Sequence, residues 1–135
     1  MSTKRAPRVA QYMTRLPHTI DHRQPLAQAH ELMRTYQIRH LPVLQDGKLL
    51  GLVSLRDLHL IETLRDVDPN DVPVEDAMAD NPYTVSPDEP LDAVAAVMAN
   101  NKIGSAVVVD QGEVQGIFTT VDALRALLHL WKEQP

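Results

Sequence analysis

Two segments of the chain, Gly51–Asp57 and Gly116–Asp122, repeat one pattern: glycine, two apolar residues, a hydroxyl residue and, three positions later, aspartate. The hydroxyl residues are Ser54 and Thr119, and each stands between a strand-like apolar run and a helix-like segment. The N-terminus of a helix, with its free N–H groups and an adjacent hydroxyl, attracts phosphate. A carboxylate one turn into such a helix can accept both hydroxyls of a ribose, as acidic residues do in other nucleotide-binding folds.

The same spacing also fits a capping box. In that arrangement a Ser or Thr side chain and an acid three residues later bond each other's backbone N–H groups at a helix start. Asp57 and Asp122 would then only stabilise the starts of two helices, each by about 1 kcal/mol. The residues alone leave both explanations open.

The rest of the sequence lacks the motifs of known catalytic and metal centres. It has no Walker phosphate loop, no Gly-x-Gly-x-x-Gly, no Gly-x-Ser-x-Gly and no His-Glu-x-x-His. It has no cysteine, which excludes disulfides, thiolate zinc sites and cysteine nucleophiles. His18 and His22 are four residues apart but lie across a predicted helix start, so we do not expect a zinc pair. We expect no catalytic residues, no metal site and no required cofactor, and hence a protein that is not an enzyme.

The composition and net charge argue against two classes of binding partner. The chain has 135 residues, of which 44% are hydrophobic and 23% charged, and a formal net charge of −5. These values are typical of a globular domain, and the acidic balance argues against nucleic acid and against anionic membranes as partners. The longest apolar stretch, Ala93 to Ala99, is far shorter than the ~20 residues of a membrane-spanning helix. With no secretory signal visible, we expect a soluble protein in the cytoplasm.

A tandem repeat organises the whole chain. When the sequence is shifted by 65 residues, twelve of the fifty positions from Val9 to Leu58 meet an identical residue without a gap. Four of the five glycines fall in such pairs. We therefore expect two domains of one design, at residues 1–65 and 74–135, joined by a polar linker at 66–73 that contains two prolines.

Each repeat predicts the same order of elements: strand, helix, strand, strand, helix. A short strand (Thr19–Ile20, Thr84–Val85) leads to a first helix, which we expect to begin in a capping box at Asp21 or Ser86. Two strands joined by a tight turn follow, and then a second helix. The predicted ranges are 41–44, 49–53 and 55–64 in the first repeat, and 106–109, 114–118 and 120–131 in the second.

Three motifs recur in order in both repeats. They are Val9–Thr14, Ile38–Val43 and Gly51–Asp57, followed by Val74–Met78, Ile103–Val108 and Gly116–Asp122. Taken together they resemble the CBS domain, the cystathionine-β-synthase type, and the resemblance covers about residues 7 to 128. The chain is similar to stand-alone proteins made of a tandem pair of these domains.

The resemblance implies an α/β fold of the α+β type, in which two tandem β-α-β-β-α repeats pack sheet to sheet with pseudo-twofold symmetry and leave two clefts. Such clefts bind AMP, ADP, ATP or S-adenosylmethionine as regulatory ligands. By the same resemblance Asp57 and Asp122 hold the ribose, and Ser54 and Thr119 lie near the phosphates. The residues implied to enclose the base are Thr19, Ile20, Ile38 and Leu41 in the first repeat, and Thr84, Val85, Ile103 and Ala106 in the second.

The repeats differ where the resemblance implies that basic residues neutralise phosphate. The first repeat has Arg39 and His40, and the second has Gly104 and Ser105. Because the fork of an arginine pairs well with oxyanions, we expect unequal sites, with the Arg39 site binding phosphorylated ligands better. A surface strand edge is the alternative explanation for Arg39 and His40.

These expectations define a regulatory module that senses an adenosine-containing ligand and transmits its occupancy to a separate effector protein. The resemblance implies a homodimer, and the apolar residues of the second helices could supply the contact or simply fill the core. The alternative function is an interaction scaffold whose clefts stay empty. Binding to nucleic acid is a further possibility, and the net charge of −5 argues against it.

Overall fold

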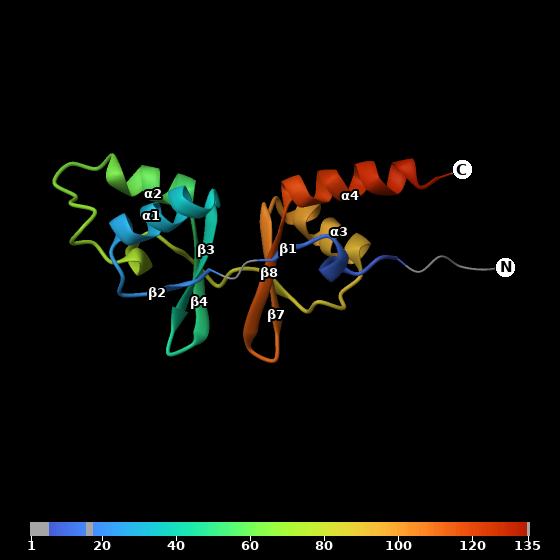
Figure 1. The fold of residues 1–135 in the computed structure, drawn as a ribbon, viewed down its shortest axis with the longest axis horizontal. Helices are drawn as coiled ribbons and strands as arrows, with labels where there is room; N and C mark the ends of the chain where they lie inside the picture. The colour runs from blue at the N-terminus through green and yellow to red at the C-terminus, as the bar shows by residue number, and fades with distance from the viewer. Residues whose placement is uncertain (1–5, 16–17, 135) are drawn as a thin grey trace. The chain divides into compact units, whose positions relative to one another are not determined.

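The computed structural model describes residues 6–15 and 18–134 of the chain (Figure 1). Four helices alternate with pairs of strands: α1 (Leu26–Tyr36), α2 (Leu55–Glu62), α3 (Leu91–Asn101) and α4 (Thr120–Lys132). The strands are β1 (Thr14–Arg15), β2 (Ile20–Asp21), β3 (His40–Gln45), β4 (Lys48–Ser54), β5 (Ala79–Asp80), β6 (Thr84–Val85), β7 (Ser105–Asp110) and β8 (Glu113–Thr119). Two single-turn helices, η1 (Val9–Gln11) and η2 (Val74–Asp76), precede β1 and β5.

The strands form two four-stranded mixed sheets with the same topology. One has the order β2-β3-β4-β5 and the other β1-β8-β7-β6. In each sheet the short strand before the first helix runs parallel to its neighbour, and the other pairs are antiparallel. The predicted α+β class and the β-α-β-β-α order of both repeats are therefore confirmed.

The two compact units of the structure do not coincide with the two sequence repeats. Unit 1 contains residues 6–15 and 83–134, and unit 2 contains residues 18–82. This division differs from the expected boundaries at 1–65, 66–73 and 74–135. The physical reason is strand pairing: β1 joins β8 through Thr14↔Ile117, and β5 joins β4 through Gly51↔Asp80. Residues 66–73, which we expected as a linker, lie inside unit 2.

The hairpins form as the sequence predicts. Two residues connect β3 to β4, and both have positive φ, 53° at Asp46 and 79° at Gly47. Gln111 and Gly112 repeat this conformation between β7 and β8, at 52° and 81°. Such turns match the twist of the strands, and the glycine adopts the left-handed region without steric cost.

The predicted capping boxes at Asp21 and Ser86 are wrong. Helices α1 and α3 begin after Pro25 and Pro90, and neither has a side-chain cap. A residue before proline is restricted to extended conformations, so the helix cannot start further upstream. Asp21 instead accepts a hydrogen bond from the N–H of Arg23 at 3.0 Å within a turn.

Each unit has its own core, between its sheet and the two helices that lie on one side of it (Figure 1). In unit 2, Leu26 and Met33 of α1 and Leu58 of α2 pack against the strands. In unit 1, Val94 and Met98 of α3 and Ala126 of α4 do the same. Within the described ranges, none of the helices is long and apolar enough to cross a membrane.

Candidate functional site

Both predicted hydroxyl–aspartate pairs form complete capping boxes. At the start of α2, Oγ of Ser54 accepts a hydrogen bond from the N–H of Asp57 at 3.1 Å, and Oδ2 of Asp57 accepts from the N–H of Ser54 at 2.9 Å. At the start of α4, Thr119 and Asp122 make the same two bonds at 3.3 and 2.9 Å. The structural explanation of the pattern is thus correct, and any ligand must bind to groups already held in place by these bonds.

The N-terminus of α2 has few N–H groups left for an anion. The N–H groups of Ser54 and Asp57 are bonded within the capping box, and that of Leu55 donates to the carbonyl oxygen of Arg39 at 2.9 Å. The same bond joins Thr120 to Gly104 in unit 1, at 3.1 Å. A phosphate at either helix start would therefore depend on cationic side chains more than on the helix itself.

Unit 2 brings such side chains together. His40 lies opposite Ser54 in the β3–β4 ladder, so the end of β3 and the start of α2 meet at one edge of the sheet. A pocket of ≈ 530 Å³ opens there and exposes Arg39 and Arg56. Its lining consists of Arg39, His40, Ser54, Leu55, Arg56, His59, Leu60 and Thr63. The two arginines give this pocket the positive charge that a phosphate requires, and the two histidine rings add further hydrogen-bonding nitrogen atoms.

The corresponding positions in unit 1 have no cationic side chain. Gly104 and Ser105 replace Arg39 and His40, and Val121 and Leu124 replace Arg56 and His59. A pocket of ≈ 330 Å³ lies beside Gly104 and Thr120, and its lining is mostly apolar with Lys102 as the one cationic residue. The pocket of the first repeat thus has more cationic side chains than that of the second, as the sequence predicts. Ligand binding to either pocket stays a prediction.

Arg56 and His59 are the two basic pocket residues that our sequence analysis missed. They lie three residues apart on α2, so they share one face of the helix. The tandem repeat could have revealed these two residues. A comparison of the two second helices, position by position, finds polar residues in one where the other has Val121 and Leu124.

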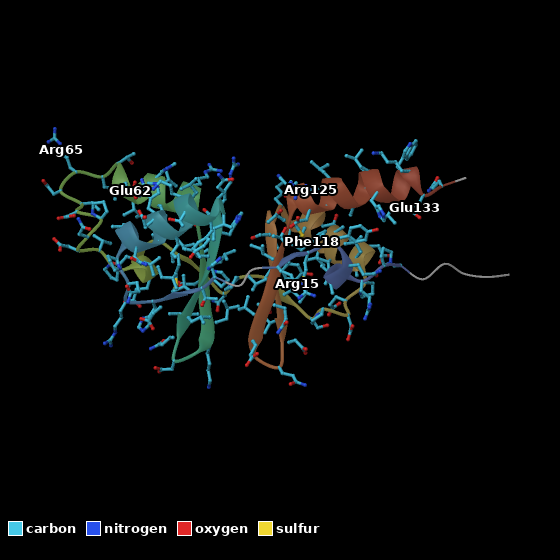
Figure 2. All side chains as sticks on the ribbon, viewed as in Figure 1. Arg15, Glu62, Arg65, Phe118, Arg125 and Glu133 are labelled. Atoms are coloured by element: carbon cyan, nitrogen blue, oxygen red, sulfur yellow. The ribbon has the colours of Figure 1, made fainter. Side chains whose placement is uncertain are left out.

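Asp122 is the more enclosed of the two aspartates, with 3% of its surface exposed. Besides the bonds of its capping box, Oδ1 accepts a hydrogen bond from the hydroxyl of Thr14 at 2.8 Å. Oδ2 accepts a further bond from the hydroxyl of Thr119 at 3.1 Å, and Arg125 lies 3.8 Å from Oδ1. Figure 2 labels Arg125 on α4, one turn after Asp122.

The eight residues that the family resemblance implies around the base differ in the burial of their side chains. Four have side chains buried in the cores of their units: Ile20, Leu41, Val85 and Ala106. Because those side chains pack inward, only backbone atoms at these positions are available to a ligand. The other four are at least partly accessible: Thr19, Ile38, Thr84 and Ile103.

His18 and His22 both contact other side chains of the protein. Among the described residues, no group of three or more His, Cys, Asp or Glu side chains has the arrangement of a metal site. His22 is buried and its Nδ1 lies 2.8 Å from Oε2 of Glu75. The ring of His18 stacks on that of Tyr36, with centroids 3.8 Å apart. These contacts give both histidines structural roles.

Known proteins resemble the chain over nearly its full length. The chain is 31% identical over 120 residues to inosine-5′-monophosphate dehydrogenase of Korarchaeum cryptofilum, which covers 88% of this chain and 24% of that enzyme. It thus spans about a quarter of the length of the first curated relatives that it matches. The matched region of the dehydrogenase is only a small part of the enzyme.

Two solved structures contain adenosine compounds. The CBS domain pair of protein MJ0100, in complex with 5′-methylthioadenosine and S-adenosyl-L-methionine, superposes with a TM-score of 0.81 and 28% identity, covering 93% of this chain and 98% of that one. CBSX2 in complex with AMP gives a TM-score of 0.77 and 26% identity, covering 92% and 98%.

The family model described as "CBS domain" matches residues 9–60 and 74–129. The two matches fall on the two sequence repeats, and each contains one of the capping-box aspartates described above. The chain is therefore a member of the CBS domain family, with two copies of the domain in tandem.

Proposed function

We propose that the chain is a regulatory module that binds a phosphorylated adenosine compound and transmits its occupancy to a separate effector protein. The observation that carries this proposal is the basic pocket of unit 2, which Arg39, His40, Arg56 and His59 line together with Ser54. The adenosine compounds bound by MJ0100 and CBSX2 support the nature of the ligand. The charge of the pocket favours AMP, ADP or ATP over S-adenosylmethionine, which has a positively charged sulfonium.

In this proposal each group of the ligand has its own residues. Asp57 accepts the ribose hydroxyls, Ser54 lies near the phosphates, and the arginines balance the phosphate charge. The base lies against backbone atoms near Ile20 and Leu41 and the accessible faces of Thr19 and Ile38. In unit 1 the corresponding positions are Thr84, Val85, Ile103 and Ala106, with Thr119 and Asp122 as the polar pair.

A ligand regulates only if it binds two conformations of the protein with different affinity. An adenine nucleotide that favoured one conformation would make the chain a sensor of cellular energy in the cytoplasm. The chain itself would perform no catalysis and need no cofactor.

Calorimetry with AMP, ADP, ATP and S-adenosylmethionine tests the proposal. We expect AMP to bind, and the double variant Arg39→Ala/Arg56→Ala to weaken that binding at least tenfold, because it removes two phosphate partners. Arg65→Ala is the matched control, since Arg65 lies outside the pocket in the loop after α2 and projects from it (Figure 2). If AMP affinity fell equally in the double variant and in Arg65→Ala, the loss would come from the changed net charge of the protein. That result would contradict a phosphate site in the pocket.

A second candidate function, an interaction scaffold, is favoured by the surface of α4. Five apolar residues of this helix are more than half exposed: Val121, Leu124, Leu127, Leu128 and Trp131. Exposed apolar surface of this extent marks an interaction site. We take a second copy of the chain as the occupant, because a twofold axis places one self-complementary apolar face against itself. The corresponding positions of unit 2 have the polar residues Arg56, His59, Glu62 and Thr63 and do not form such an apolar face.

A further inference from the structure

The two capping-box aspartates differ in the oxygen that points away from the helix start. Oδ1 of Asp122 accepts the hydroxyl of Thr14 at 2.8 Å and lies 3.8 Å from the guanidinium of Arg125. Asp57 makes the matching capping bond with Oδ2, but within the described part of the chain its Oδ1 accepts no hydrogen bond. One carboxylate is therefore satisfied by the protein, and the other retains an acceptor.

The sequence explains this difference. With the repeat of 65 residues, Thr14 corresponds to Ala79 and Arg125 corresponds to Leu60. Both Thr14 and Ala79 lie in the short strands that complete the two sheets, β1 and β5, at matching positions. Alanine and leucine have no hydrogen-bond donor in their side chains, so neither of these two positions in unit 2 supplies a donor to Oδ1 of Asp57.

We propose that Thr14 determines which of the two aspartates can bind a ribose. A ribose hydroxyl that approached Asp122 would have to replace the Thr14 hydroxyl, and exchanging one hydroxyl–carboxylate bond for another gains almost nothing. At Asp57 the same hydroxyl adds a bond that the free protein lacks. The chain then binds one nucleoside at Asp57, while Asp122 holds β1 in its sheet. This inference rests on the proposed function, because it assumes that the aspartates bind ribose.

Reciprocal substitutions test the inference, with calorimetry as the readout and 5′-methylthioadenosine as the probe. This compound has no phosphate, so the basic pocket does not influence the result. We expect one site per chain in the wild type, abolished by Asp57→Asn and retained in Asp122→Asn. Thr14→Ala should create a second site that Asp122→Asn removes. Ala79→Thr should weaken the first site about tenfold, the value of one hydrogen bond to a charged group.

Thr14→Ser is the matched control, because it keeps the hydroxyl and should leave one site per chain. Two equal sites in the wild type, or no gain of a site in Thr14→Ala, would overturn the inference. Absence of binding by the wild type and by Thr14→Ala would also overturn it. The proposed function fails as well only if AMP does not bind either, so the two failures are distinguishable.

Discussion

A methyl group on Gly116 would lie 2.5 Å from the carbonyl oxygen of Thr14, closer than real Cβ atoms approach backbone. Gly51 is equally confined, because a Cβ there would lie 2.7 Å from the carbonyl oxygen of Ala79 and 2.5 Å from Sδ of Met78. In both units, therefore, the edge strand can join the sheet only because its neighbour has a glycine at this position. The two glycines are conditions for the pairing of β1 with β8 and of β5 with β4.

We predict that Gly116→Ala and Gly51→Ala each destabilise their unit by about 1–3 kcal/mol, the usual cost of forcing extra atoms into a packed site. Chemical denaturation gives the free energy of unfolding. Gly104→Ala is the control, since the nearest atom to its Cβ would be 4.0 Å away. If all three variants were equally stable, β1 and β5 would not be paired as described.

The two aspartates should contribute unequally to stability. Asp57→Ala removes one capping box and should cost about 1 kcal/mol. Asp122→Ala also removes acceptors for the hydroxyls of Thr14 and Thr119 at a buried position, and we expect about 2–3 kcal/mol. Denaturant unfolding of the two single variants measures the difference. Equal costs would mean that the Thr14 bond adds nothing in solution.

Tyr83 should make the stability of unit 1 sensitive to alkaline pH. Burial, and secondly the negative charge of Glu89, raise the pKa of Tyr83 above its ordinary value of 10.0. Because the folded chain holds this proton more tightly than the unfolded chain, the stabilisation is complete below pH 10 and is lost as the pH rises through the folded pKa. Tyr83→Phe should flatten the decline in unfolding free energy above pH 10. A decline of the same slope in the variant would assign the effect to other groups.

The exposed face of α4 should mediate self-association. We predict a molar mass of about twice 15.1 kDa for the wild type by light scattering, and that of one chain for Leu124→Glu/Leu128→Glu, because buried carboxylates oppose the contact. Leu60→Glu is the control, since Leu60 is an equally exposed residue of α2. A wild type of single-chain mass would contradict the scaffold function and leave the α4 face to another partner.

The elements that the sequence predicted correctly are those determined by neighbouring residues. Asp46–Gly47 specifies its turn, and Ser54 with Asp57 specifies the start of α2, whatever lies elsewhere in the chain. The starts of α1 and α3 were wrong because Pro25 and Pro90 restrict the residue before them more strongly than Asp21 or Ser86 favours a helix.

The pairing of strands that lie far apart in the chain could not be predicted from the pattern of apolar and polar residues. Strand β1 has two residues, Thr14 and Arg15, both exposed, so it has no alternation of apolar residues to reveal it. Through the pairing of β1 with β8, residues 6–15 belong to the same compact unit as residues 83–134. Arg56 was missed for a different reason, because a charged residue on an exposed helix face is ordinary until Arg39 is found beside the same pocket.

The placement of β1 has a consequence for synthesis of the chain. Thr14 leaves the ribosome roughly a hundred residues before its partner Ile117, whereas all strands of unit 2 are outside the ribosome once Asp80 has left it. Because synthesis proceeds from the N-terminus, a domain tends to fold as soon as all of its residues are available. A strand pairing that closes a long loop also costs more entropy than a pairing between neighbouring strands. Unit 2 is thus topologically an insertion in unit 1, and nascent β1 gains its neighbour only after β8 has been made.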